Sequence, residues 1–126
     1  MPARFRERLG AGFYLTIAEP DPCLALYPAA AWDEFCQKLK DAPLKDTTYR
    51  RIVRRIFANT EEATCDPQGR LAIPPHLRAY AGIKKDVVSV GTLTRVEIWA
   101  KEAYTDGAGT PAGDDVAKFV SDLGLY

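Results

Sequence analysis

The sequence predicts an α+β protein in which short strands frame an inserted pair of helices. Over several short segments bounded by Gly, Pro and Asp, apolar residues alternate with polar ones, which is the pattern of strands. Two segments in the middle of the chain instead carry apolar residues at helical spacing. The chain also matches itself at an offset of 72 residues, which indicates an internal repeat.

Length and composition are those of one small globular domain. The chain has 126 residues, of which 47% are hydrophobic and 27% charged, so neither disorder nor membrane embedding is indicated. No apolar run approaches the ~20 residues that a transmembrane helix needs, and the N-terminal segment lacks the apolar core of a signal peptide. We therefore expect a cytoplasmic protein with no membrane partner.

Three cysteines and one histidine lie far apart along the chain, at Cys23, Cys36, Cys65 and His76. Their spacing does not suit structural zinc, so we expect no metal and no cofactor, and we expect the thiols to be buried and reduced. The sequence carries no nucleophile elbow, phosphate-binding loop or zinc-protease motif, so we do not expect an enzyme. We interpret His76 as an exposed helix residue.

The expected strands follow in chain order. They cover residues 13–17, 23–27, 62–65, 70–73, 87–90 and 95–99. The first central helix covers residues 29–42, between Pro28 and Pro43, and the second covers residues 44–59. One helical turn is expected after the double proline at 74–75. Residues 116–126 are predicted either to form a short docking helix or to be disordered when alone.

The net charge is zero, but the charges are unevenly distributed along the chain. Residues 44–58 contain one acid and the basic residues Lys45, Arg50, Arg51, Arg54 and Arg55. The tail from residue 105 contains four aspartates and one lysine. A local basic field attracts phosphate even in a neutral protein. The arginine face of the second helix therefore has a structural interpretation, as a solvated face or an interface with neighbouring acids such as Glu61 and Glu62, and a functional one, as a phosphate-binding surface.

The repeat superposes residues 1–10 on 73–82 and residues 23–32 on 95–104. The matched pairs include Pro2 with Pro74, Gly10 with Gly82, Tyr27 with Trp99, and Trp32 with Tyr104. We expect Tyr27, Trp32 and Trp99 to pack in the core and not to stack on bases. The segment DPQGRLA before the second copy has its counterpart upstream of Met1, so the first copy is truncated and strand 13–17 is expected at an apolar sheet edge.

Three segments together resemble the MraZ proteins, relatives of the AbrB-type regulators: DPQGRLAIPPHLRAYAG, KDVVSVGTLTRVEIWAKEAY, and CLALYPAAAW in the first copy. The resemblance covers nearly the whole chain. It implies a small β-barrel of two AbrB-like (swapped-hairpin) repeats with a two-helix insert and a short C-terminal helix. The resemblance divides the chain into four parts. They are a first repeat at 1–32 truncated at its N-terminus, a helical connection at 33–59, a second repeat at 60–104, and a linker and tail at 105–126.

The same resemblance implies a sequence-specific regulator that represses the division and cell wall gene cluster. Members of this family bind direct repeats in their own promoter as a ring-shaped homo-oligomer, so the expected partner is double-stranded DNA and the expected location is cytoplasmic and nucleoid-associated. The alternative is an AbrB-like protein-interaction module of the antitoxin type, with weak DNA binding or none.

The resemblance places the DNA-binding element at the turn from Asp66 to Arg70. Asp66 can accept backbone hydrogen bonds, Gly69 tolerates positive φ, and an outward Arg70 can hold phosphate or guanine. Gln68 stands where the family often has lysine. The other predicted DNA-binding residues are Arg4, Arg6, Arg8, Arg78, Lys84 and Lys85. The structural alternatives are an Asx-type turn with Arg70 paired to a nearby acid, and a solvated loop at the two lysines.

Overall fold

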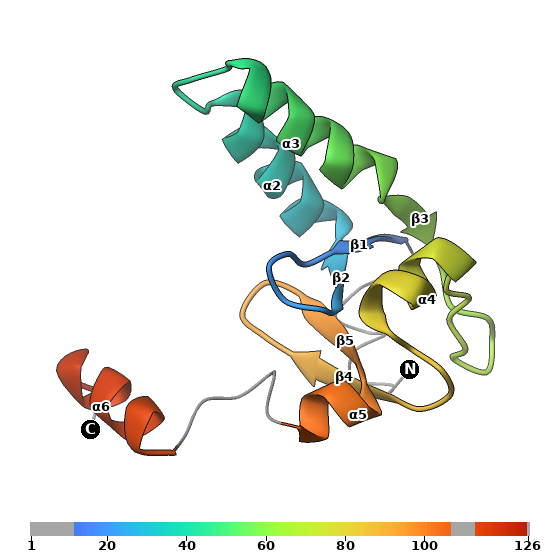
Figure 1. Cartoon of the computed structure of the whole chain (residues 1–126), viewed down its shortest axis with the longest axis vertical. Helices are drawn as coiled ribbons and strands as arrows, with labels where there is room; N and C mark the ends of the chain where they lie inside the picture. The colour runs from blue at the N-terminus through green and yellow to red at the C-terminus, as the bar shows by residue number, and fades with distance from the viewer. Residues whose placement is uncertain (1–11, 107–112, 126) are drawn as a thin grey trace.

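The computed structural model describes residues 12–106 and 113–125 and confirms the α+β class (Figure 1). The strands are β1 (Phe13–Ile17), β2 (Leu24–Pro28), β3 (Glu61–Ala63), β4 (Val87–Gly91) and β5 (Val96–Ala100). The helices are α2 (Ala29–Lys40), α3 (Thr47–Ala58), α4 (Pro75–Ala81), α5 (Lys101–Thr105) and α6 (Gly113–Asp122). In Figure 1 the α2–α3 hairpin extends from the sheet at one end of the molecule, and α5 lies at the other end.

The strands form one antiparallel sheet in the order β3-β1-β2-β5-β4. Its centre is the pairing of β2 with β5, in which Ala25 lies opposite Glu97. These two residues are also equivalent at the repeat offset of 72. The two copies of the repeat are therefore present as two hairpins, β1–β2 and β4–β5, joined about this central pair.

The prediction that residues 13–17 form an edge strand of the sheet is wrong. β1 is paired on both sides, with β2 and with β3, and the edge strands are β3 and β4 instead. The reason is that β3, at the start of the second repeat, pairs with β1 of the first repeat. Closure into a swapped-hairpin barrel stays a prediction.

The prediction of a strand over residues 70–73 is also wrong. This segment makes only an isolated bridge, between Leu71 and Cys65. Pro74 follows directly and has no backbone N–H to continue a ladder. The other strands lie within two residues of their predicted bounds. We did not expect α5 as a separate helix.

The alternation of the central strands sorts the core onto the two faces of the sheet. On one face Leu24 and Leu26 pack with Val96 and with Leu77 of α4. On the other face Ala25, Tyr27 and Trp99 pack with Trp32 of α2. All of these residues are buried, so the prediction that the repeated aromatic residues belong to the core is confirmed.

The helical hairpin is fixed by local capping and by contact between its helices. The Asp46 side chain accepts a hydrogen bond from the backbone N–H of Tyr49 at 2.9 Å, which sets the start of α3 later than the predicted residue 44. The Tyr49 hydroxyl in turn donates to the Leu39 carbonyl at the end of α2, at 2.7 Å. In the described part of the chain, no helix combines the length and the apolar character that crossing a membrane requires.

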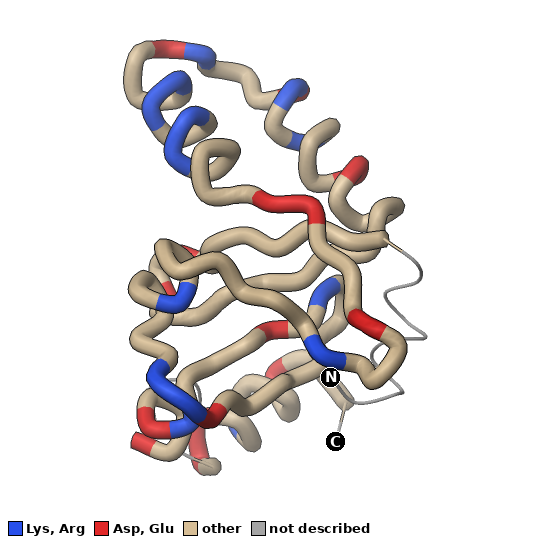
Figure 2. Tube along the Cα trace, turned by 90° about the vertical axis from the view of Figure 1, so that its right-hand side faces the viewer, with Lys and Arg blue, Asp and Glu red and all other residues tan. Residues whose placement is uncertain are grey.

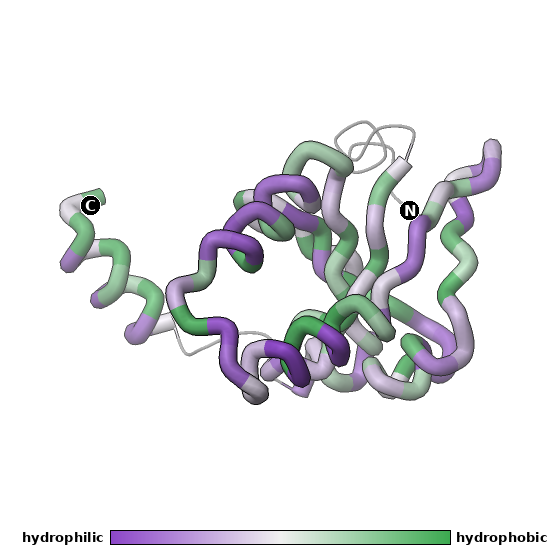
Figure 3. The backbone as a smooth tube through the Cα atoms, turned by 90° about the horizontal axis from the view of Figure 1, so that it is seen from above, coloured by the Kyte–Doolittle hydropathy of each residue, from purple (hydrophilic) through white to green (hydrophobic). Residues whose placement is uncertain are grey.

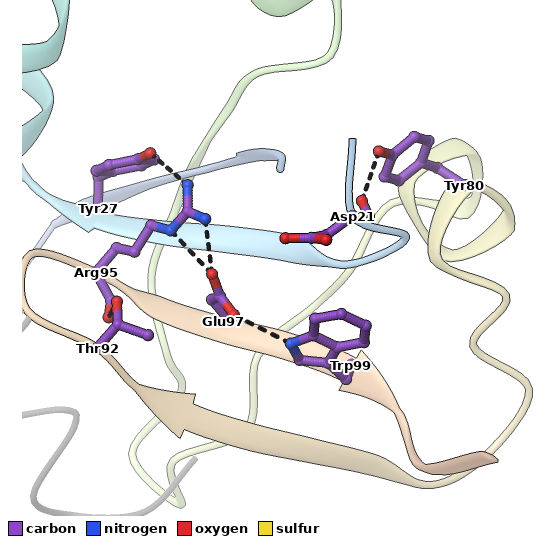
Figure 4. A network of polar contacts seen from close by, with 7 residues as sticks. All are labelled: Asp21, Tyr27, Tyr80, Thr92, Arg95, Glu97 and Trp99. Atoms are coloured by element: carbon purple, nitrogen blue, oxygen red, sulfur yellow. Dashed lines mark hydrogen bonds and ion pairs between the residues drawn. The ribbon is translucent and has the colours of Figure 1, made fainter. Parts of the chain in front are cut away.

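A polar network joins the two copies at the middle of the sheet (Figure 4). Arg95 donates to the Tyr27 hydroxyl at 2.9 Å and to the Glu97 carboxylate at 2.6 Å. Glu97 also accepts from Nε1 of Trp99 at 3.2 Å. Because Tyr27 belongs to the first copy and the other three residues to the second, the network ties the copies together beneath the helical hairpin.

Candidate nucleic-acid interface

The turn from Asp66 to Arg70 connects the end of the β3 segment to the strand-like segment before α4. The backbone N–H of Asp66 donates to the Arg70 carbonyl at 2.9 Å, and that of Gly69 donates to the Asp66 carbonyl at 2.8 Å. Gly69 has a φ of 82°, a left-handed conformation in which a side chain is strained. The glycine is therefore required by the turn, as the sequence predicted.

The Asp66 carboxylate holds the turn together. Its Oδ1 accepts from the backbone N–H groups of Gln68 at 3.0 Å and Arg70 at 2.7 Å, which is the predicted Asx-type arrangement. Its Oδ2 accepts from Nε of Arg70 at 2.9 Å. The backbone hydrogen bond from Arg70, and next the guanidinium itself, lower the pKa of Asp66 below its ordinary value. The carboxylate is therefore ionised at neutral pH.

Arg70 is both paired and exposed. The pairing with a nearby acid, expected as the structural alternative, is confirmed, yet 78% of the arginine side chain remains accessible. The hydrogen bonds of its guanidinium to described residues use Nε and, at 3.5 Å to Gln68, Nη2. The pair with Asp66 thus fixes the direction of a guanidinium whose outer edge faces solvent.

Arg78, Lys84 and Lys85 follow the turn along the chain, on α4 and on the loop after it. All three are exposed, and none forms an ion pair with an acid in the described ranges. Arg78 and Lys85 line one groove of about 440 Å³ that also contains Leu71, the residue after Arg70. Lys84 lines a different groove. The structure therefore brings Arg78 and Lys85 together beside the turn and places Lys84 apart from them. Arg4, Arg6 and Arg8 lie outside the described residues.

The arginine face of α3 forms a second basic region, on the helical hairpin at the top of Figure 2. Arg55 pairs with Glu19. Arg51 and Arg54 are exposed and form no ion pair within the described residues. The face is solvated and pairs with one acid, but within the described residues that acid is not Glu61 or Glu62. β3 instead places Glu62 beside Tyr14, whose hydroxyl donates to its carboxylate at 3.3 Å.

The three cysteines are free thiols. Cys23 is buried as predicted, and burial raises its pKa to about 12, which keeps the thiol protonated and unreactive at neutral pH. The prediction of burial is wrong for Cys36 and Cys65, which are half-buried because they pack against the outside of the core clusters. His76 is exposed on α4, as predicted. The described residues contain no group of three or more His, Cys, Asp or Glu side chains that could hold a metal ion.

Sequence reasoning missed two polar contacts near these regions. Glu19 and Arg55 are 36 residues apart, and no local signal connects them. Arg95 and Glu97 are two residues apart on one strand, a spacing that places both side chains on the same face. The contact between Arg95 and Glu97 could therefore have been predicted from their spacing.

Comparison with known proteins shows one matching family and several similar relatives. The family model described as "MraZ protein, putative antitoxin-like" matches residues 1–55 and again residues 56–110. The chain is 40% identical to a protein of Clostridium tetani over 126 residues, which is 99% of this chain and 88% of that protein. It is 41% identical to a protein of Clostridium beijerinckii (99% and 88%) and 42% identical to one of Pelotomaculum thermopropionicum (99% and 87%). All three relatives are named transcriptional regulator MraZ.

Proposed function

The chain belongs to the MraZ family, and we propose that it is a transcription regulator that binds double-stranded DNA through the turn carrying Arg70. We propose this turn as the DNA-binding element because the Arg70 guanidinium is exposed and is also held in a fixed direction by Asp66. An arginine held in this way loses little conformational freedom when it donates to a phosphate or to the O6 and N7 atoms of guanine.

Basic residues near the turn support DNA binding on the same side of the molecule. Arg78 and Lys85 share a groove beside the turn and are not neutralised by acids of the described ranges. The positive charges of Arg78 and Lys85 offset the negative charge of the Asp66 carboxylate, which would otherwise repel a phosphate. In this proposal Arg70 makes the directed contact, and Arg78, Lys84 and Lys85 contribute to the local positive field. Gln68 and Gly69 shape the turn.

A single turn supplies too few contacts for useful affinity. Binding to duplex DNA usually depends on several phosphate contacts, each of which contributes a salt slope of about −0.9. In the proposal a ring-shaped homo-oligomer presents the turn at regular intervals, so that direct repeats in the chain's own promoter match the spacing of several turns. The regulated genes would be the division and cell wall cluster, the effect repression, and the location cytoplasmic and nucleoid-associated.

A second candidate is a protein-binding module of the antitoxin type. The name of the matching family, which includes the words antitoxin-like, favours it, and so does the exposed apolar side of α6, with Phe119 66% and Val116 43% exposed. In that case the partner would be a protein and DNA binding would be weak or absent.

Fluorescence anisotropy with two DNA fragments separates the candidates. One fragment comes from the region upstream of the chain's own coding sequence, and the other has the same base composition in shuffled order. We expect tighter binding to the first fragment, loss of that preference in Arg70→Ala, and its retention in Lys40→Ala, which removes an exposed positive charge on α2 away from the turn. Equal affinity of the unmodified chain for both fragments would contradict the proposed function.

A further inference from the structure

We propose that three arginines of α3, Arg50, Arg51 and Arg54, form a second DNA-binding surface that contacts the phosphate backbone without reading its sequence. We call them the outer arginines. The inference rests on the proposed function, since it takes duplex DNA as the ligand. It goes beyond that function because it assigns the sequence-independent part of the affinity to a helix outside the Arg70 turn.

α3 concentrates positive charge on one side. The segment RRIVRR contains all four arginines of the helix, and no acid lies within α3. At 3.6 residues per turn these arginines fall within one arc of roughly 140°. They form two pairs at a spacing of four residues, at which like charges destabilise a helix: Arg50 with Arg54, and Arg51 with Arg55. The stability of the helix does not account for this pattern, whereas an anionic partner does.

The opposite side of α3 is used in packing. Val53 and Ile56 are half-buried, and Ile56 packs against the core cluster that contains Trp32. The ring of Phe57 lies edge-on to that of Trp32, with 5.7 Å between the ring centroids. In Figure 3 hydrophobic and hydrophilic bands alternate along the hairpin. An amphipathic helix on a membrane buries its apolar side in lipid, but here that side packs on protein. A solvated polyanion is therefore favoured over a membrane surface.

The outer arginines are accessible and carry uncompensated charge. All three are exposed, and none forms an ion pair with an acid of residues 12–106 or 113–125. Arg50 donates to the neutral hydroxyl of Thr47 at 3.2 Å, which leaves its charge in place. Two nearby acids are engaged elsewhere, because Asp46 caps the helix and Glu19 pairs with Arg55. A guanidinium can donate two parallel hydrogen bonds to a phosphate, so the face suits a phosphate backbone.

α3 and the Arg70 turn lie on the same side of the molecule. In Figure 1 α3, β3 and α4 follow one another along the right-hand side, and Figure 2 faces that side, with basic positions on the hairpin and on the segments below it. The seven residues between Ala58 and Asp66 limit the distance from the end of α3 to the turn to about 29 Å. One helical turn of B-DNA is longer, about 34–36 Å. A single duplex can therefore contact both elements of one copy.

Removal of the three charges tests the surface. The triple variant carries Arg50→Gln, Arg51→Gln and Arg54→Gln, and glutamine keeps a similar helix propensity. Because each phosphate contact contributes a salt slope of about −0.9, we expect the slope for the shuffled fragment to become shallower by up to about 2.7 per bound copy. We expect the affinities for the upstream and shuffled fragments to fall together, by about tenfold or more at low salt, so the preference stays. Fluorescence anisotropy at a series of salt concentrations measures both, and circular dichroism verifies folding.

Two further variants are the controls. Lys38→Gln, Lys40→Gln and Lys101→Gln together remove three exposed charges outside α3 and should keep the slope. Replacement of the outer arginines by lysine keeps their charge and should restore most of the slope lost in the triple variant. The inference is overturned if the triple variant keeps the slope and affinity for the shuffled fragment, or if the lysine control loses as much. It is also overturned if the triple variant loses binding to phosphatidylserine vesicles but not to DNA, which would assign the face to a membrane.

Arg70→Ala separates failure of this inference from failure of the proposed function. If Arg70→Ala keeps the preference for the upstream fragment, the turn does not read the sequence, yet binding to the shuffled fragment still tests α3. If the triple variant loses that preference while Arg70→Ala keeps it, α3 reads the sequence and the inference is wrong. An unmodified chain that binds neither fragment overturns both.

Discussion

Arg70 donates to the carboxylate of Asp66 twice, from its backbone N–H at 2.7 Å and from its side-chain Nε at 2.9 Å. One acid therefore both closes the turn and directs the guanidinium. This dual role separates two kinds of variant in the turn. Changes at Asp66 or Gly69 alter the shape of the turn, whereas changes at Arg70 remove the guanidinium that we propose contacts DNA.

Replacement of Asp66 by asparagine should change how the stability of the protein depends on pH. The pKa of Asp66 is lowered in the folded protein, so the stability it contributes is fully present above the unfolded value near 3.8. That contribution is lost as the pH falls through the lowered folded value. We expect the free energies of unfolding of wild type and Asp66→Asn to differ by a constant amount above about pH 5 and to converge below pH 3.8.

Urea denaturation at a series of pH values measures this difference. Asp33→Asn, which removes an exposed carboxylate on α2 outside the turn, is measured in parallel as the control for loss of a surface charge. Parallel curves for wild type and Asp66→Asn down to acid pH would show that the carboxylate does not hold the turn.

Replacement of Gly69 by alanine should weaken DNA binding as well as stability. Gly69 and Gly82 have φ values of 82° and 66°, and alanine in this region costs about 1 kcal/mol. We expect both Gly69→Ala and Gly82→Ala to lower the free energy of unfolding by about that amount. Because Gly82 ends α4 and lies outside the turn, only Gly69→Ala should reduce the affinity for the upstream DNA fragment. An equal loss of affinity in both variants would show that general destabilisation is the cause.

Removal of Arg95 should destabilise the protein more than removal of Arg70. The Arg95 and Glu97 side chains are 25% and 15% exposed, and Arg95 also donates to Tyr27 in the other copy of the repeat. Breaking a fully buried pair costs about 3–5 kcal/mol, so partial exposure reduces the expected loss for Arg95→Ala to roughly 2 kcal/mol. Arg70→Ala, at a largely exposed site, should change stability by less than about 0.5 kcal/mol. Thermal or urea unfolding of the two variants compares them, and similar losses would contradict the linking role of Arg95.

Much of the fold could be predicted because its signals are local. The alternation in Phe13–Ile17 gave the bounds of β1, and the repeat gave the equivalence of Ala25 and Glu97, which lie opposite each other at the centre of the sheet. The Asp66 turn could also be predicted, since Asp, Gly and Arg at this spacing satisfy the backbone within five residues.

The features that were not predicted depend on contacts between distant segments. β3 pairs with β1 across almost fifty residues, so nothing near Glu61–Ala63 indicates its partner. The pairing of Arg55 with Glu19 likewise arises only once α3 lies against the β1–β2 loop. The segment after Arg70 has the composition of a strand, yet Pro74 leaves it a single bridge.

The salt dependence of DNA binding tests the contact of Arg70 with the duplex most directly. The logarithm of the affinity for the upstream fragment is measured against the logarithm of salt concentration, for the unmodified chain and for Arg70→Ala. If each Arg70 releases one counterion from a phosphate, the slope becomes shallower by about 0.9 for every copy that contacts the fragment. An unchanged slope and affinity in Arg70→Ala, with folding and oligomeric mass intact, would show that this guanidinium does not touch the DNA.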